Sequence, residues 1–389
     1  MRRSIQYSLV LAMTALLMPG CQTIQFEQPK VLSDSDWLVD GQNQARSRSY
    51  DEPVVPPLEM VWEYSANAAF GPGSPLLLDN RILVGTRKGE IHTVELESGR
   101  GRGFKRMGDV IEGTPVISEG FMYVPTAWGK RVLIAFDLKK GVSKWRLTGI
   151  PFSTSLVVFD DVVVGVDVEG NVRAHLKSDG SQKWSLSLGE NQSAKASPLL
   201  VGEDRMFVAT DMGMGHMIDL STESILWSLN LGAPVYNAPA SSGENIFVST
   251  TRGHLMKIDA TTGELLWTIV ADNTMVRMGP PAVDGTSVFV GGTDGRFRSV
   301  DSSTGAIRWD VQLPDVVSSA PLVSGGYVFV GTLGEELYGF EADTGNIVWK
   351  TETEGRIKSA MAVADGGLIV LSEPRWVTYY KPAGGEDND

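Results

Sequence analysis

Short apolar runs separated by turn signals dominate the chain, and the clearest instance is LMKIDATTGELLW at residues 255–267. This segment predicts a strand, a tight turn and a second strand that ends in a large aromatic residue. Asp259 can accept hydrogen bonds from the backbone of the turn, and Gly263 supplies the positive φ that closes it. Trp267 brings apolar bulk to the second strand, and its indole N–H requires an acceptor.

The same pattern recurs along the chain with a nearly constant period. Aromatic anchors follow one another at intervals of 39 to 43 residues, at Trp62, Phe104, Trp145, Trp184, Trp227, Trp267, Trp309 and Trp349. A turn signal precedes most of them, as in ESG at 97–99 and DTG at 343–345. Two units depart from the pattern, because Phe104 replaces a tryptophan and residues 221–224 contain no glycine.

Each unit also begins alike, with a short apolar strand such as SPLLL at 74–78 or APLVS at 320–324. A tight turn and a β-branched strand follow, so that each unit contains four short strands and no helical period. Four antiparallel strands in each repeat of this length are typical of a β-propeller blade. We count eight groups, and the strand around residues 60–64 supplies the strand that the last group lacks. The prediction is an all-β, eight-bladed β-propeller of four-stranded antiparallel blades over residues 58–382, closed by the N-terminal strand.

The composition disfavours some classes of partner and excludes some kinds of site. The chain has 47 acidic and 34 basic residues and a formal net charge of −13, so negatively charged nucleic acid is disfavoured as a partner. We interpret this acidity as that of a soluble surface. Cys21 is the single cysteine of the sequence, which excludes an internal disulfide and a thiolate metal cluster.

The position of Cys21 suggests why the chain has a cysteine. A basic start, MRR, precedes an apolar run at 7–18 that is too short to span a bilayer. The sequence LMPGC at 17–21 resembles the lipobox of bacterial lipoproteins, which implies removal of signal peptide 1–20 and lipidation of Cys21. An ordinary signal peptide with a chance cysteine is the alternative. By the same resemblance, Gln22 implies a lipid-anchored protein at the periplasmic face of the outer membrane.

The remaining terminal segments lack strand periodicity. Residues 21–57 are polar and contain prolines, which predicts a lipidated N-terminus followed by a flexible tether. Trp37 is the exception and is a candidate for docking on the propeller. Residues 383–389 form an acidic tail.

The pattern Asp-x-x-Thr-Gly-x-x-x-Trp at 259–267 resembles the pyrroloquinoline-quinone-like (PQQ-like) propeller repeat. In an eight-bladed periplasmic lipoprotein of this length, the repeats resemble those of the BamB family of outer-membrane assembly lipoproteins. The resemblance implies a non-enzymatic scaffold without a cofactor. It also implies a monomer within a complex, which binds the outer-membrane barrel-assembly subunit and unfolded outer-membrane proteins.

The resemblance extends to a docking loop. BamB proteins dock through the pattern Leu-Ser-Leu-Arg-Gly-Glu-Ser-Ala-Pro, and this chain has SLSLGE at 185–190 and ASP at 196–198, without the arginine. The resemblance therefore implies Leu186, Leu188 and Glu190 as partner-binding residues. Lys195 is the nearby residue that can supply the missing positive charge.

The sequence also bears on two other functions, quinone-dependent oxidation and copper binding. The enzymatic relatives of the repeat are quinoprotein dehydrogenases, and that resemblance would require a vicinal disulfide and a calcium site, whereas the chain has one cysteine. A Cu(I) site is the other alternative, because Met212, Met214, His216 and Met217 offer thioethers and an imidazole within six residues. The same four side chains can instead fill a strand and a blade loop.

The alternative function is therefore a PQQ-like propeller lipoprotein that binds another envelope protein or a copper ion through residues 212–217. The sequence leaves open the identity of the partner, the propeller face that docks it, and whether a small ligand occupies the central channel.

Overall fold

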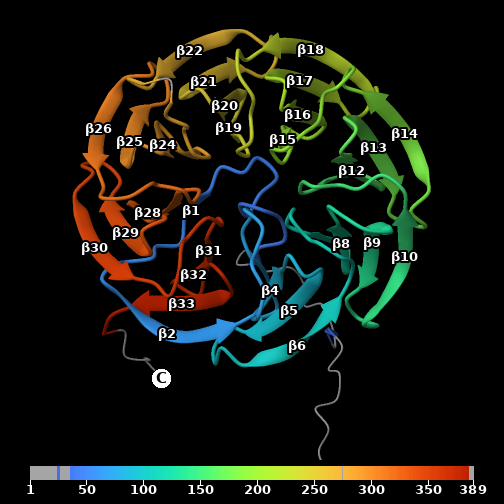
Figure 1. The fold of residues 1–389 in the computed structure, drawn as a ribbon, viewed down its shortest axis with the longest axis horizontal. Helices are drawn as coiled ribbons and strands as arrows, with labels where there is room; N and C mark the ends of the chain where they lie inside the picture. Colours follow the sequence, from blue (N-terminus) through green and yellow to red (C-terminus); the bar gives the residue numbers. More distant parts are fainter. Residues whose placement is uncertain (1–23, 27–35, 274, 385–389) are drawn as a thin grey trace, which may run out of the picture.

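The computed structural model describes residues 24–26, 36–273 and 275–384. Eight antiparallel sheets stand around a central axis like the blades of a propeller (Figure 1). The described part of the chain contains no helix, and its strands number 33. The predicted all-β, eight-bladed propeller is confirmed. Among these same residues, no helix is long and apolar enough to cross a membrane.

Each blade runs outward from an inner strand at the channel to an outer strand at the rim. The first four blades are β3 (Leu76–Leu78), β4 (Arg81–Gly85), β5 (Glu90–Glu95), β6 (Gly101–Arg106); β7 (Val116–Ser118), β8 (Phe121–Pro125), β9 (Arg131–Asp137), β10 (Val142–Thr148); β11 (Val157–Phe159), β12 (Val162–Val166), β13 (Asn171–Leu176), β14 (Gln182–Ser187); and β15 (Leu199–Val201), β16 (Arg205–Ala209), β17 (Met214–Asp219), β18 (Ser224–Asn230).

The other four blades repeat this order. They are β19 (Ala240–Ser242), β20 (Asn245–Ser249), β21 (His254–Asp259), β22 (Leu265–Val270); β23 (Ala282–Asp284), β24 (Ser287–Gly291), β25 (Arg296–Asp301), β26 (Ile307–Gln312); β27 (Leu322–Ser324), β28 (Tyr327–Gly331), β29 (Glu336–Glu341), β30 (Ile347–Glu352); and β31 (Ala362–Ala364), β32 (Gly367–Ser372), β33 (Trp376–Pro382), β2 (Leu58–Ser65).

The last blade closes the ring with strands from both ends of the propeller. β2 pairs antiparallel with β33, with Leu58 opposite Pro382 and Ser65 opposite Trp376. The sheet order β2-β33-β32-β31 gives this blade its outer strand from the N-terminal part of the chain. The closure predicted from the unpaired N-terminal anchor is therefore confirmed. Unfolding the last blade must break this pairing between distant parts of the chain, so the pairing couples the two ends of the propeller.

The repeated Asp, Gly and Trp residues join neighbouring blades. In the turn between β21 and β22, Asp259 Oδ1 accepts the backbone N–H groups of Thr261 and Thr262 at 2.9 and 2.8 Å. Gly263 has φ +75°, and a Cβ there would lie 2.7 Å from the ring of Trp227 in the preceding blade. The indole N–H of Trp227 donates to the carbonyl of Ala260 at 2.9 Å. Each turn is thus the docking surface for the tryptophan before it.

The same indole bond links most of the other blades. A tryptophan Nε1 donates to a carbonyl of the next blade at 2.7 to 3.1 Å in the pairs Trp62–Leu96, Trp145–Lys177, Trp267–Ser302, Trp309–Ala342 and Trp349–Leu58. The two units that lack the full Gly and Trp pattern make other contacts. Phe104 stacks on His92 at 5.1 Å, and Glu223 adopts φ 58° where other turns have glycine.

The hydrophobic core lies between the blades rather than in one central mass. The second strands are almost wholly buried, as in β24, while the outer strands expose alternate residues, as in β22. Phe289 of β24 is fully buried and packs against Trp309 at 5.9 Å. Burial of one such side chain contributes about 1.5–3 kcal/mol, and each blade interface contains several.

Residues 36–57 enter the channel of the propeller and are here called the channel segment. The predicted flexible tether is wrong for these residues. Trp37 is buried, bridges to Leu77, and donates its indole N–H to Ser74 Oγ at 3.1 Å, so its expected docking on the propeller is found. Further on, β1 (Ser49–Tyr50) pairs parallel with β27. In Figure 1 the segment is the dark-blue loop at the centre of the ring.

The inner strands explain why the segment is ordered. An inner strand has no neighbour on its channel side, so its backbone N–H groups there need acceptors. In seven blades the middle residue of the inner strand donates its N–H to the channel segment, namely Leu77 to Trp37 O, Ile117 to Leu38 O, Val158 to Gln44 Oε1, Leu200 to Gln44 O, Ser241 to Ala45 O, Val283 to Ser47 O and Val323 to Arg48 O. Residues 1–20, Cys21 and residues 385–389 lie outside the described residues.

Candidate functional site

The two faces of the disc carry different connections. Strand direction alternates within a blade, so the blade-to-blade connections and the loops between second and third strands lie on one face, here called the loop face. The tight turns, such as the one at Asp259, lie on the opposite turn face. Because loops vary more freely than tight turns, the loop face is the natural place for a binding site.

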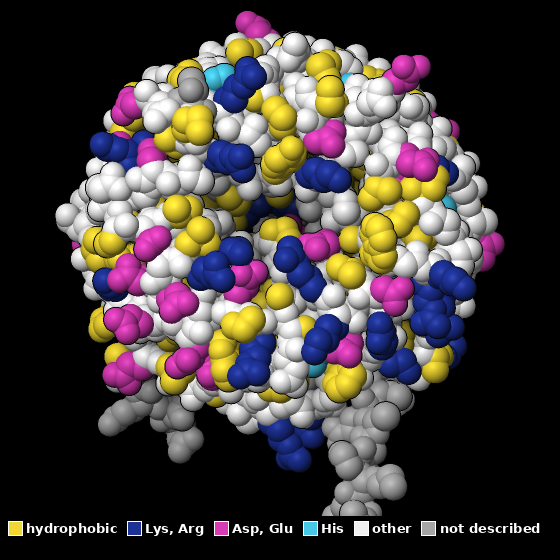
Figure 2. Space-filling model, in the orientation of Figure 1, with side chains coloured by type: hydrophobic (Ala, Val, Ile, Leu, Met, Phe, Trp, Pro, Cys, Tyr) yellow, Lys and Arg dark blue, Asp and Glu magenta, His cyan; other side chains and the backbone are white. Residues whose placement is uncertain are grey.

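Large apolar side chains on the loop face are exposed to solvent. Trp128, Met212, Tyr236 and Met275 are 72, 62, 50 and 82% exposed, and each lies in a loop of that face. Figure 2, which looks onto this face, shows apolar side chains grouped around a central hollow. Exposed aromatic and methionine side chains are typical of protein-binding surfaces, because aromatic rings bury a large area and flexible methionines adapt to the shape of a partner.

The predicted docking loop lies between β14 and β15 and is only partly on the surface. Leu186 is half-buried, and Leu188 is buried in the core between two blades. The N–H of Leu188 donates to Gly170 O at 3.0 Å, which fixes the start of the loop. Glu190 and Lys195 are exposed. The structure thus leaves two of the four predicted residues available to a partner, and makes the two leucines part of the fold.

The predicted Met/His segment does not converge on one point. His216 and Met217 are consecutive in β17, so their side chains point to opposite faces of the sheet. Met217 is buried in the core, Met212 is exposed in the loop before the strand, and Met214 is half-buried.

His216 is occupied by hydrogen bonds. Its Nδ1 lies 2.8 Å from Ser228 Oγ and its Nε2 lies 3.1 Å from Gln192 Oε1. Burial lowers its pKa, which keeps the ring neutral. Among the described residues, no group of three or more His, Cys, Asp or Glu side chains is arranged to hold a metal ion. The structure therefore gives the copper alternative no preformed ligand set.

The hollow at the centre of the loop face is the mouth of the central channel. Its cavity volume is about 60 Å³, and residues from the inter-blade connections of all eight blades line it. Asp40 and Arg48 of the channel segment form its floor, and Lys195 and Lys358 lie on its wall. Figure 2 shows basic side chains within and around this hollow. The channel segment therefore closes the channel, and the mouth ends on its charged side chains.

The floor of the mouth contains more positive than negative charge. Arg46 Nε lies 3.2 Å from Asp40 Oδ2 in a fully buried ion pair, and Asp40 Oδ1 accepts the N–H of Ser74 at 2.9 Å. Arg48 Nη1 donates to Pro281 O at 2.5 Å. Burial lowers the pKa of Arg48 to about 10, although Asp40 opposes this shift, and burial lowers the pKa of Arg46 as well. Two guanidinium groups thus share one carboxylate.

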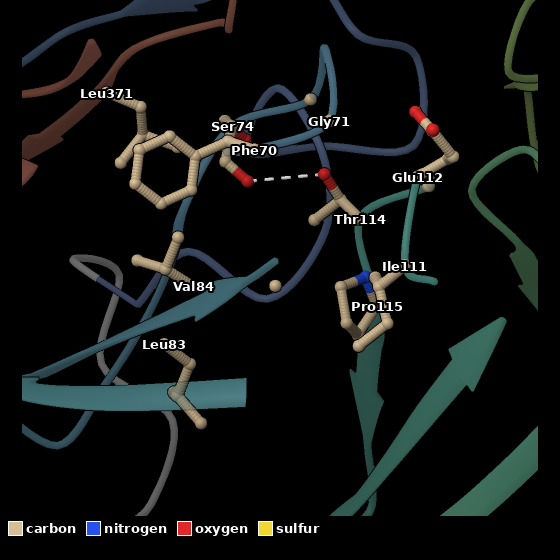
Figure 3. Close-up of a pocket in the computed structure, with 13 residues that line it drawn as sticks. Phe70, Gly71, Ser74, Leu83, Val84, Ile111, Glu112, Thr114, Pro115 and Leu371 are labelled. Carbon is tan, nitrogen blue, oxygen red and sulfur yellow. Dashed lines mark hydrogen bonds between the residues drawn. The ribbon is translucent and has the colours of Figure 1, made fainter. Parts of the chain in front are cut away.

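The connections around the mouth interlock. Figure 3 shows the contact between the first two blades, where Thr114 Oγ1 donates to Ser74 O at 3.2 Å. A Cβ at Gly71 would lie 1.9 Å from Glu112 O, so only glycine allows the two loops to approach this closely. The loop face is therefore a rigid platform with a hollow centre.

Sequence reasoning missed Asp40, Arg46 and Arg48. One signal could have pointed to the two arginines, because ARSRS at 45–49 places them two residues apart in a strongly acidic protein.

A family model and a curated relative that match this chain carry the same description. The family model described as outer membrane protein assembly factor BamB matches residues 59–197, 168–316 and 314–387. The outer membrane protein assembly factor BamB of Legionella pneumophila (strain Paris) is 26% identical over 200 residues, which are 48% of this chain and 50% of that protein. The chain thus spans about half the length of this curated relative.

Enzymes and solved structures are also similar. The dehydrogenase subunit of a quinone-dependent alcohol dehydrogenase from Gluconacetobacter polyoxogenes is 27% identical over 97 residues, or 22% of this chain and 13% of that protein. The crystal structure of BamB from Moraxella catarrhalis aligns with a TM-score of 0.70 at 18% identity, covering 83% of this chain and 99% of that one. At this identity the structural likeness shows the fold alone.

The residues of this chain do not fit a quinone cofactor of the kind suggested by the dehydrogenases. The sequence has one cysteine and cannot form a disulfide between neighbouring cysteines. The described residues offer no acidic cluster for a metal ion beside the channel, and side chains of the channel segment occupy the floor of its mouth. No step through such a cofactor is derived.

Proposed function

The chain belongs to the family of the outer membrane protein assembly factor BamB, and from this membership we propose that it is a non-enzymatic accessory subunit of the machinery that assembles outer-membrane β-barrel proteins. The observation that carries the proposal is the family match, which extends from residue 59 to residue 387. The match thus includes all eight blades and is not confined to one repeat.

The loop face is the docking surface in this proposal. It is rigid because its connections interlock, and it carries the exposed Trp128, Met212, Tyr236 and Met275. Glu190 and Lys195 add one charge of each sign in the loop that corresponds to the family's docking segment. A rigid surface with apolar anchors can bind a folded partner without a large loss of conformational entropy.

The N-terminal residues orient the proposed scaffold. The N–H of Phe26 donates to Leu138 O at 2.9 Å, and Arg81 Nη1 donates to Gln25 O at 2.8 Å. Leu138 and Arg81 both adjoin tight turns of the turn face. A lipid on Cys21 would lie within about 12 Å of Ile24, given the length of an extended residue. We therefore place the turn face toward the outer membrane and the loop face toward the periplasm.

Affinity capture from detergent-solubilised envelopes of the source organism tests the proposal. The double variant Glu190→Lys/Lys195→Glu changes two exposed side chains of the docking loop and leaves the net charge unchanged. Glu97→Lys/Lys139→Glu is the matched control, because both residues are exposed in tight turns of the turn face. Substitution of Leu186 or Leu188 would be uninformative, since it would disrupt the core.

The proposal predicts that the barrel-assembly subunit co-purifies with the native protein and with the control, and that the loop variant captures much less of it. Capture of unrelated envelope proteins only, by a correctly folded native protein, would show that the family likeness does not extend to this partner. Equal capture by both variants would instead move the docking surface away from the loop.

A further inference from the structure

The mouth of the channel contains a buried cation that has no counter-ion of its own. Arg48 is 4% exposed and forms no ion pair within the described residues, since Asp40 is paired with Arg46. Its Nη1 donates to backbone carbonyls, but its Nε has no acceptor among the described protein groups. Burying a charged group without a partner is unfavourable, so this guanidinium favours the entry of an anion.

The wall of the mouth adds positive charge. Lys358 is neutralised by Glu373 at 2.7 Å, and Glu112 by Arg87 at 3.0 Å. Lys195 is exposed and has no ion pair within the part of the chain that the structure describes. Arg48 and Lys195 therefore leave two positive charges uncompensated in a protein whose net charge is −13. A concave site focuses this local field, which attracts small anions.

A neutral hydrogen-bonding group completes the site. Ser153 lines the same hollow, and its Oγ has no partner among the described protein groups although it is shielded from solvent. Asn237 and Ser318 also line the wall, but their side chains already donate to Met278 O and Ile357 O at 2.8 and 2.6 Å. The mouth thus offers a cation at its floor, a cation at its rim and one hydroxyl without a partner.

We propose that the mouth of the channel is a binding site for carboxylate groups, held by Arg48 at the floor and Lys195 at the rim. Two separate cations that line one hollow suit a ligand with two carboxylates. Such a ligand is either a short acidic stretch of a protein or a free dicarboxylic acid. This site goes beyond the proposed assembly role and does not depend on the family assignment.

Isothermal titration calorimetry on the purified full chain at low ionic strength tests the site. The probes are succinate and the capped tripeptide acetyl-Asp-Gly-Asp-amide, and their uncharged controls are succinamide and acetyl-Asn-Gly-Asn-amide. The site predicts that at least one acid binds and that its amide counterpart does not bind measurably. Binding of the peptide alone identifies the carboxylate source as a protein segment, and binding of succinate alone identifies it as a small acid.

Two variants assign the binding to the mouth. Lys195→Gln should weaken binding by about tenfold, the change expected from the loss of one charge-assisted hydrogen bond. Lys139→Gln, on the turn face, should leave binding unchanged. Because Lys195 is exposed, its substitution does not endanger the fold, whereas Arg48→Gln requires a thermal-unfolding control. The proposal is overturned if neither acid binds more tightly than its amide, or if Lys195→Gln and Lys139→Gln have equal effects.

Discussion

Removal of Asp40 from its buried ion pair with Arg46 should be one of the most destabilising single changes in the protein. Both side chains are buried, at 4 and 3% exposure; their pair closes a loop within the channel segment, and Asp40 Oδ1 also accepts the N–H of Ser74 next to the first blade. Asp40→Ala leaves the Arg46 guanidinium without its carboxylate and the N–H of Ser74 without its acceptor. Breaking a buried pair from one side costs about 3–5 kcal/mol, because the remaining charge stays desolvated.

An exposed pair supplies the control. Asp109 and Arg106 are 3.4 Å apart and more than half exposed, so Asp109→Ala should cost no more than about 1 kcal/mol. The double variant Asp40→Ala/Arg46→Met should be less destabilised than Asp40→Ala alone, because it no longer buries an unpaired charge.

Urea unfolding followed by tryptophan fluorescence measures the three differences, and Trp37 within the channel segment makes the signal sensitive to its release. Limited proteolysis of residues 36–57 separates local release of the segment from global unfolding. If Asp40→Ala costs as little as Asp109→Ala, or if the double variant is less stable than Asp40→Ala, the pair does not hold the segment in the way described.

Three further outcomes follow from the same contacts. Gly263→Ala should destabilise the protein by about 2–4 kcal/mol, through a strained positive φ and a clash with Trp227. Gly243→Ala in the same blade should cost only the backbone strain, about 1 kcal/mol, because nothing lies within 4 Å of its Cβ. Equal losses of stability in urea unfolding would contradict the role given to the tryptophan contact. Glu223→Gly should raise stability by about 0.5–1 kcal/mol, because Glu223 occupies φ 58° in a turn where glycine is unstrained, and an unchanged urea midpoint would refute this. Stability should also fall as the pH drops from about 7.5 to about 5.5, because burial lowers the pKa of His92, His175 and His216 below the unfolded value near 6.5. The stabilisation by these neutral histidines is complete above the unfolded pKa and is lost as the pH falls through their folded pKa values. A melting temperature that is constant over this pH range would contradict the prediction.

The propeller could be predicted because its determinants are local and repeated. The turn at Asp259, the glycine that follows it and the tryptophan after that are separated by a few residues, and each acts on a neighbouring blade. The ring closure was also predictable, because β2 carries an anchor aromatic with no blade before it. A repeated local pattern therefore determined the number and the order of the blades.

The channel segment could not be predicted in the same way. Its acceptors meet donors from inner strands spread over nearly the whole propeller; the carbonyl of Arg48, for example, accepts the N–H of Val323 in β27. These contacts have no sequence period, and most use backbone groups that any residue supplies. A polar, proline-containing segment therefore had the composition of a tether although its backbone is bonded throughout the channel.

The docking loop shows a second reason why site residues could not all be predicted from the sequence. Trp184, Leu186 and Leu188 alternate with polar residues, and this alternation is that of a strand whose apolar side faces the core. The resemblance to a family motif suggested surface residues, whereas the strand period indicated burial, and the structure follows the strand period for the two leucines. Motif likeness should be checked against strand alternation before residues are chosen for mutagenesis.

Site-specific photo-crosslinking in cells of the source organism tests the central claim most directly. A photoreactive phenylalanine analogue at Tyr236 reports on the loop face, and the same analogue at Glu97 reports on the turn face. The account predicts that Tyr236 crosslinks to the outer-membrane barrel-assembly subunit and that Glu97 does not. Crosslinks to that subunit from Glu97 alone would contradict the assigned face, and the absence of that subunit from the crosslinks of both positions would contradict the assembly role.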